Sequence, residues 1–73
     1  MKNNLKFMLL REKLGESQVS LAKKARVSRT GIWRIENYGD IPSLLSAIKI
    51  AKACNLKTIE EMEDIFLPSD AQI

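Results

Sequence analysis

The pattern of apolar and polar residues predicts two short helices back to back, at residues 17–25 and 28–36. The apolar positions follow helical spacing, with Leu21, Ala22 and Ala25 in the first segment and Ile32 and Ile35 in the second. Only Arg26 and Val27 separate the two segments. A connection this short makes the helices cross at a steep angle, so we expect a helix-turn-helix motif.

The outward face of the second segment is basic and rich in hydrogen-bonding groups. It carries Arg29, Thr30, Trp33 and Arg34. Ser17 and Ser28 stand just before the two helical runs, where a serine oxygen can accept a hydrogen bond from a first-turn N–H. We interpret the second helix as one whose outward face enters a DNA groove.

Three further helices are expected around this pair, at about residues 4–14, 44–54 and 59–66. Asn3 or Asn4 can cap the first of them, and Thr58 with Glu61 forms a capping box for the last. The residues expected to face the core are Phe7, Leu10 and Leu14, then Leu44, Ala47, Ile48, Ala51 and Cys54, and finally Ile59, Met62 and Phe66.

Length and composition indicate one small globular domain. The chain has 73 residues, and its hydrophobic content of 45% argues against disorder. No strand pattern is present, so the sequence predicts an all-α fold, a compact five-helix bundle in residues 1–67 with a C-terminal tail in residues 68–73. The apolar runs are too short to span a bilayer and the N-terminus lacks a signal-peptide cleavage site, so we expect a cytoplasmic protein.

The cysteine and histidine counts restrict the possible chemistry. One cysteine and no histidine exclude a disulfide framework and a Cys/His zinc site, and they fit a reducing compartment. The same counts remove most nucleophile–base pairs. We therefore expect no enzyme activity, no metal and no small-molecule cofactor, and we assign no catalytic residue.

The charges are divided unevenly along the chain. Residues 1–35 hold nine basic and two acidic side chains, a net charge of +7, whereas residues 36–73 hold three basic and seven acidic ones, a net charge of −4. Such a division orients the molecule toward a polyanion. Charge asymmetry is also common in small domains, so by itself it leaves nucleic-acid binding open.

Residues spread over positions 7–56 occur at the spacing of a known family. They are Arg11, Ser17, Gln18, Leu21, Ala22, Val27, Ser28, Ile32, Ile35, Glu36, Pro42, Ser43 and Ala51. In this register the chain resembles the phage repressor/Cro-type (XRE-like) helix-turn-helix family. The resemblance implies a lambda-repressor-like domain of five helices, which binds double-stranded operator DNA as a homodimer with its third helix in the major groove.

The resemblance makes the segment 28–36 the recognition helix. The residues then expected to contact DNA bases or backbone are Ser28, Arg29, Thr30, Trp33 and Arg34. Arg29 and Arg34 point broadly the same way, and arginine is the usual reader of guanine. Trp33 keeps two interpretations, because its indole can contact a thymine methyl or the sugar-phosphate wall, or it can lie across Gly31 or the following loop.

Contacts with DNA phosphates are expected at the start of the second helix and around the turn. The residues assigned to them are Ser17, Gln18, Lys23 and Arg26. Free N–H groups at a helix N-terminus favour an anion beside Ser17 and Gln18. Arg11 and Glu36 match a structural ion pair of the family, which ties the first helix to the end of the recognition helix.

Four positions depart from the family pattern: Glu16, Arg26, Tyr38 and Asp40. Arg26 stands where many members have glycine, so a left-handed backbone there would cost roughly 1 kcal/mol. Tyr38 also replaces a glycine, and Asp40 puts a negative charge where many members have a basic residue. Glu16 replaces a residue that is usually apolar. We therefore expect the loop after the recognition helix to differ from the family.

A dimer interface is expected at Ile65 and Leu67. The residues Ile59, Met62 and Phe66 already give the last helix an inward stripe, so these two apolar side chains are left over. A contact across a two-fold axis would bury them. In the alternative interpretation they close the core of one protomer over the first helix.

Three functions from different classes are compatible with the sequence. The first is a sequence-specific transcriptional regulator, a repressor, that binds a pseudo-palindromic operator. The second is an antitoxin-like or other protein-interaction module on the same fold, with the acidic half as its surface. The third is a small enzyme, for which the sequence offers no acid/base or metal constellation.

Overall fold

Each of the five helices begins after a polar side chain that accepts a hydrogen bond from a first-turn N–H. The structure, a computed structural model, describes residues 3–67. In this range it contains α1 (Leu5–Lys13), α2 (Gln18–Ala25), α3 (Arg29–Tyr38), α4 (Leu44–Ala53) and α5 (Ile59–Phe66). Their capping residues are Asn4, Ser17, Ser28, Ser43 and Thr58. Thr58 and Glu61 form the predicted capping box.

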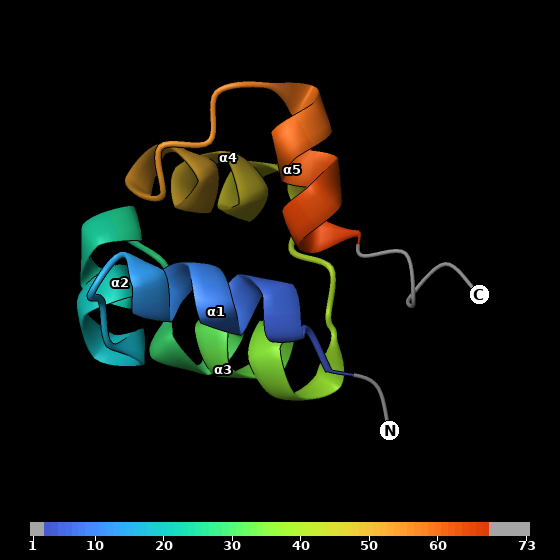
Figure 1. Ribbon diagram of the computed structural model, residues 1–73. Coiled ribbons are helices and arrows are strands. Elements are labelled where there is room, and N and C mark those ends of the chain that lie inside the picture. The colour runs from blue at the N-terminus through green and yellow to red at the C-terminus, as the bar shows by residue number, and fades with distance from the viewer. Residues whose placement is uncertain (1–2, 68–73) are drawn as a thin grey trace.

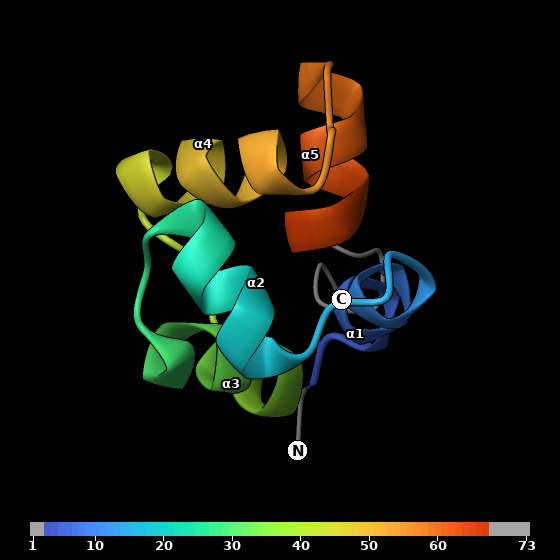
Figure 2. The ribbon, with the colours of Figure 1, turned by 90° about the vertical axis from the view of Figure 1, so that its left-hand side faces the viewer.

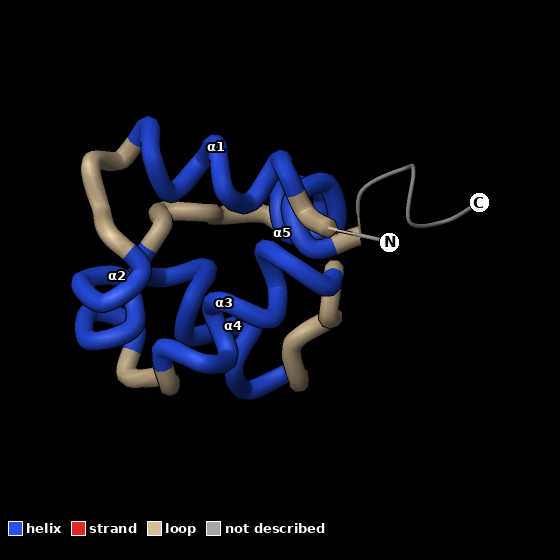
Figure 3. Tube along the Cα trace, turned by 90° about the horizontal axis from the view of Figure 1, so that it is seen from below, coloured by secondary structure: helices blue, strands red, loops and turns tan. Residues whose placement is uncertain are grey.

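The helices form two levels, with α1 and α3 below α4 and α5 in the view of Figure 1. α2 joins the levels because it contacts both α3 and α4, as Figure 2 shows from the side. α1 packs on α3 and also reaches α5. Figure 3 shows only helices and loops in the described part of the chain, so the predicted all-α bundle is confirmed. The predicted tail, residues 68–73, lies outside the described residues.

The hydrophobic core receives residues from all five helices. Its buried members are Phe7, Leu21, Ala22, Ala25, Ile32, Ile35, Ala47, Ile50, Cys54 and Phe66. The rings of Phe7 and Phe66, with centroids 6.1 Å apart, join the first helix to the last. Burial raises the pKa of the Cys54 thiol. The inward faces predicted for α2 and α3 are confirmed by this core.

Asn4 is a buried polar residue that connects three helices. Its side-chain oxygen accepts a hydrogen bond from the N–H of Phe7 at 3.0 Å, and its Nδ2 donates to the carbonyl oxygen of Ile65 at 2.7 Å. Its backbone N–H donates to the carbonyl oxygen of Glu36 at 3.0 Å. One residue therefore holds the start of α1 against α3 and the end of α5.

Three of the predicted core positions are exposed because they lie at helix ends. Leu44 is 76% exposed and Ile59 is 71% exposed, and they are the first residues of α4 and α5. Leu14 follows the last residue of α1 and is also exposed. The spacing of apolar residues records the face of a helix, but it does not record where the neighbouring helices stop covering that face.

The buried stripe of α4 is also rotated relative to the prediction. Its buried residues are Ala47, Ile50 and Ala51, followed by the C-cap Cys54. Ile50 is 1% exposed, whereas Ile48, which was predicted to be buried, lies at the edge of the stripe and is exposed. Both choices fit a helical period, so periodicity alone selected the wrong isoleucine.

Candidate nucleic-acid interface

A left-handed residue makes the turn between α2 and α3. Arg26 has φ 60° and ψ 44°, a left-handed conformation that glycine adopts at no steric cost. The N–H of the next residue, Val27, donates to the carbonyl oxygen of Ala22 at 3.0 Å, and the Val27 side chain packs against the core. The Oγ of Ser28 then accepts a hydrogen bond from the N–H of Gly31 at 3.0 Å and starts α3.

The two faces of α3 differ sharply in burial. Ile32 and Ile35 are buried on the inner face, whereas the outer face is in solvent. The exposed predicted contact residues are Ser28, Arg29, Thr30, Trp33 and Arg34. Arg29, Thr30 and Trp33 together line one open hollow of about 300 Å³. Ser28 and Arg34 line a second hollow, so the five predicted residues are all exposed but are divided between two neighbouring parts of the α3 surface.

The end of α3 carries a cluster that the sequence prediction did not foresee. The rings of Trp33 and Tyr38 meet at 88° with their centroids 5.2 Å apart. The Cζ of Arg34 lies 5.5 Å from the Tyr38 centroid, and the Nε of Arg34 donates to Oδ2 of Asp40 at 2.7 Å. Trp33 thus packs beside Tyr38 while remaining partly exposed. The sequence signal for the contact between Arg34 and Tyr38 was their four-residue spacing, which makes two residues neighbours on a helix.

A buried ion pair fixes the orientation of α3 relative to α1. The Nε and Nη2 of Arg11 donate to the two carboxylate oxygens of Glu36 at 2.6 and 3.0 Å. The two side chains are only 11% and 4% exposed. The hydrogen bond to Glu36 raises the pKa of Arg11. Glu36 is therefore a structural residue of α3 and is not presented to a ligand.

The start of α2 is joined to this ion pair. The Nε2 of Gln18 donates to Oε1 of Glu36 at 3.1 Å, so the side chain predicted to contact phosphate is already engaged. Ser17 and Ser20 form a reciprocal capping box, in which Ser17 Oγ accepts from the Ser20 N–H at 3.0 Å. This capping bond uses the first-turn N–H of Ser20, so that N–H is not free for a phosphate. The Ser17 residue itself remains exposed.

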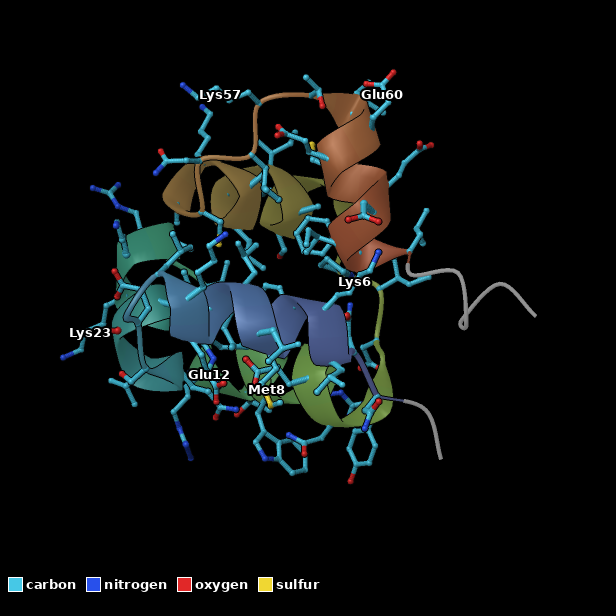
Figure 4. The ribbon with its side chains drawn as sticks, in the orientation of Figure 1. Lys6, Met8, Glu12, Lys23, Lys57 and Glu60 are labelled. Atoms are coloured by element: carbon cyan, nitrogen blue, oxygen red, sulfur yellow. The ribbon has the colours of Figure 1, made fainter. Side chains whose placement is uncertain are left out.

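The predicted phosphate-contact residues Lys23 and Arg26 are exposed but lie apart from the start of α2. Figure 4 shows Lys23 extending from α2 into solvent. Arg26, at the other end of α2, lines an open hollow with Lys24, Lys49 and Lys52. Arg26 and Lys49 also line a second hollow that includes Arg34. Lys49 and Lys52 of α4 were not among the predicted contact residues, because the charge count had placed them in the acidic half of the chain.

The two residues predicted for a dimer interface have different surroundings. Ile65 is half-buried and packs against the core. Leu67 is also half-buried and lines an apolar groove of about 270 Å³. The exposed Ile41, Leu44 and Ile59 lie in the same groove. The groove therefore gathers three of the exposed apolar residues beside the half-buried Leu67.

Residues 3–67 contain neither a cluster of metal ligands nor a membrane-spanning helix. There, no group of three or more histidine, cysteine, aspartate or glutamate residues is placed to hold a metal ion. In the same range, none of the helices has the length and apolar character needed to cross a bilayer.

Comparison with known proteins agrees with this geometry. A helix-turn-helix family model (HTH_3) matches residues 7–62. The Bacillus subtilis (strain 168) protein named Uncharacterized HTH-type transcriptional regulator YgzD is 42% identical over 66 residues, which cover 90% of this chain and 91% of that protein. No solved structure gives a significant match. With the family pattern running through most of its length, the chain belongs to the XRE-type helix-turn-helix family.

Proposed function

We propose that the protein is a sequence-specific DNA-binding transcriptional regulator that places α3 in the major groove. The observation that carries this proposal is the outer face of α3, where Arg29, Thr30 and Arg34 stand in solvent on a helix whose inner face is buried. Arginine and threonine side chains supply the donors that read base edges. The likeness to a protein named as a transcriptional regulator supports the same function.

Contacts with the phosphate backbone would orient this helix. We assign them to Ser17 and Gln18 at the start of α2, where Gln18 can offer the second N–H of the Nε2 that donates to Glu36, and to Lys23 on the exposed side of α2 and Arg26 at its end. Phosphate contacts fix the register of a protein on the duplex, whereas base contacts supply the specificity. The net charge of +7 in residues 1–35 favours the approach of α2 and α3 to DNA over that of the acidic half.

We further propose that the protein binds a pseudo-palindromic operator as a homodimer. One recognition helix reads few base pairs, and two copies would read half-sites about 34 Å apart. The surface proposed for the second copy is the apolar groove of Ile41, Leu44, Ile59 and Leu67. Among residues 3–67, Glu63 is the one charged residue that lines it. Ile41 lies in the loop after α3, so the proposed contact would connect to the recognition helix through that loop. A direct role for Ile65 in this contact stays a prediction.

A repressor is the simplest regulator of this kind. Occupying an operator is enough to exclude another protein from the same stretch of DNA, and it requires no further binding surface. Repression is therefore our proposed outcome of binding. It would be tested by placing the selected operator within a promoter and measuring expression from it with and without the protein.

Selection of bound oligonucleotides followed by titration tests the proposal. We expect one preferred, two-fold-related sequence, and an affinity that falls steeply with salt as counterions leave the DNA. Arg34→Ala should weaken binding to the preferred site by about 1–3 kcal/mol and relax the preference at one base pair. Lys57→Ala removes a positive charge from the end of the molecule away from α3 and serves as the control.

Two results would contradict the proposal. If Arg34→Ala lowered the affinity for every DNA sequence equally, Arg34 would be a phosphate contact and not a base contact. Binding with no sequence preference and little salt dependence would favour the alternative, an antitoxin-like or other protein-interaction module.

A further inference from the structure

The carboxylate of Asp40 holds the guanidinium of Arg34 from one side. Gly39 ends α3 in a left-handed conformation, with φ 67° and ψ 24°, and turns the chain back toward the helix. The backbone N–H of Asp40 donates to the carbonyl oxygen of Arg34 at 3.4 Å, and the Nε of Arg34 donates to Oδ2 of Asp40 at 2.7 Å. The two residues are therefore joined through both backbone and side chain.

The ring of Tyr38 bounds the same guanidinium on another side. The Cζ of Arg34 lies 5.5 Å from the ring centroid, a distance that allows a cation–π contact. Trp33 packs against that ring nearly at a right angle and supports its position. A long arginine side chain normally loses rotamer freedom when it binds a ligand, and a side chain already held by neighbours loses less.

The part of the guanidinium that stays available is its outer edge. Within residues 3–67 the hydrogen bond of the Arg34 side chain uses Nε, and its two Nη groups have no hydrogen-bond partner. Arginine can donate two parallel hydrogen bonds to O6 and N7 of guanine. We propose that Asp40 is a specificity-determining residue, which orients Arg34 so that its Nη edge meets a guanine in the major groove. This inference rests on the proposed function, since it requires α3 to lie in that groove.

The charge of Asp40 gives this inference a distinctive consequence. A carboxylate beside the recognition helix repels phosphates, so on its own it weakens binding to every DNA sequence. Any benefit for one sequence must come from the orientation of Arg34. Removing the charge should therefore weaken binding to the preferred site while it leaves binding to unrelated DNA unchanged or slightly stronger.

The test compares wild type with Asp40→Asn at one salt concentration. Affinities are measured by fluorescence anisotropy for the selected operator, for an operator with the guanine assigned to Arg34 replaced, and for an unrelated duplex. We expect the preference for the operator over the other two duplexes to fall by about tenfold. Glu60→Gln removes a carboxylate from the end of α5 away from α3, as Figure 4 shows, and should leave that preference unchanged.

A double variant separates orientation from general charge effects. In an Arg34→Ala background, Asp40→Asn should produce no further loss of preference, because Asp40 acts through Arg34. The same loss in both backgrounds, or an equal gain of affinity for all three duplexes, would overturn the inference. Failure of the wild-type protein to select any sequence would overturn the proposed function instead. Asp40 and Arg34 are both partly exposed, so thermal unfolding of Asp40→Asn is expected to match that of Glu60→Gln.

Discussion

Replacing Glu36 with alanine is expected to remove a large part of the stability of the domain. The Glu36 carboxylate accepts three hydrogen bonds, two from Arg11 and one from Gln18. After Glu36→Ala, the guanidinium of Arg11 keeps its bond from Nη1 to the carbonyl oxygen of Glu16 at 2.8 Å but loses its counter-charge while remaining buried. Breaking one partner of a buried pair costs about 3–5 kcal/mol.

This cost is large relative to the stability that a chain of this length can have. At about 0.05–0.15 kcal/mol per residue, the free energy of unfolding would be roughly 4–11 kcal/mol. In a domain of this size, 1 kcal/mol corresponds to about 4–8 °C in Tm, so the variant should melt at least about 12 °C lower than wild type. Urea unfolding followed by far-UV circular dichroism would measure the loss.

The control is Glu12→Ala, which removes an exposed glutamate from α1 and should change stability by about 0.5 kcal/mol or less. A Glu36→Ala variant no less stable than this control would refute the assigned role of the ion pair. The role would also be refuted if the losses of stability caused by Arg11→Ala and Glu36→Ala simply added in the double variant. If the two residues are coupled, the double variant must lose less stability than the sum of the two single losses.

Three further predictions concern the turn, the groove and the last helix. Arg26→Gly should raise the free energy of unfolding by about 1 kcal/mol in a urea titration, because it relieves the left-handed strain. A lower stability than wild type would show that the arginine side chain contributes more than its backbone costs. Ile59→Asp, in the apolar groove, should give a monomer by sedimentation at micromolar concentration and weaken operator binding; unchanged sedimentation and affinity would place the dimer contact elsewhere. The N–H groups of Lys57 and Thr58 lower the pKa of Glu61, so its contribution to stability is present above its ordinary pKa and is lost as the pH falls through the lowered value. Glu61→Gln should therefore be less stable than wild type near neutral pH, and urea midpoints should converge in acid; a constant difference would contradict this linkage.

The helix-turn-helix was predictable because several local signals agree there. Ser17 and Ser28 cap the two helices, the apolar residues share one face, and the connection is too short for another arrangement. The Arg11–Glu36 pair was predictable only through the family resemblance, because the two residues are 25 positions apart and no local pattern links them. Their contact depends on how α1 crosses α3, which is a property of the packed bundle.

The parts that sequence reasoning missed depend on where helices end. The prediction stopped the recognition helix at Glu36, whereas α3 continues through Tyr38 and ends at Gly39. Those extra residues bring Tyr38 one turn after Arg34 and allow Asp40 to reach back to it. Leu44 and Ile59 of the groove were likewise misassigned to the core, since an uncovered Leu44 has the same sequence pattern as a buried one.

The contacts of Asn4 and Phe7 with α5 have a consequence for the order in which the chain is made. α2 and α3 are synthesised before Ile65 and Phe66, the partners of Asn4 and Phe7. Until those residues emerge, the Nδ2 of Asn4 lacks its acceptor and the ring of Phe7 remains uncovered on one side. The packing of α1 is therefore completed only when α5 has been made, so the last helix closes the bundle that the earlier helices begin.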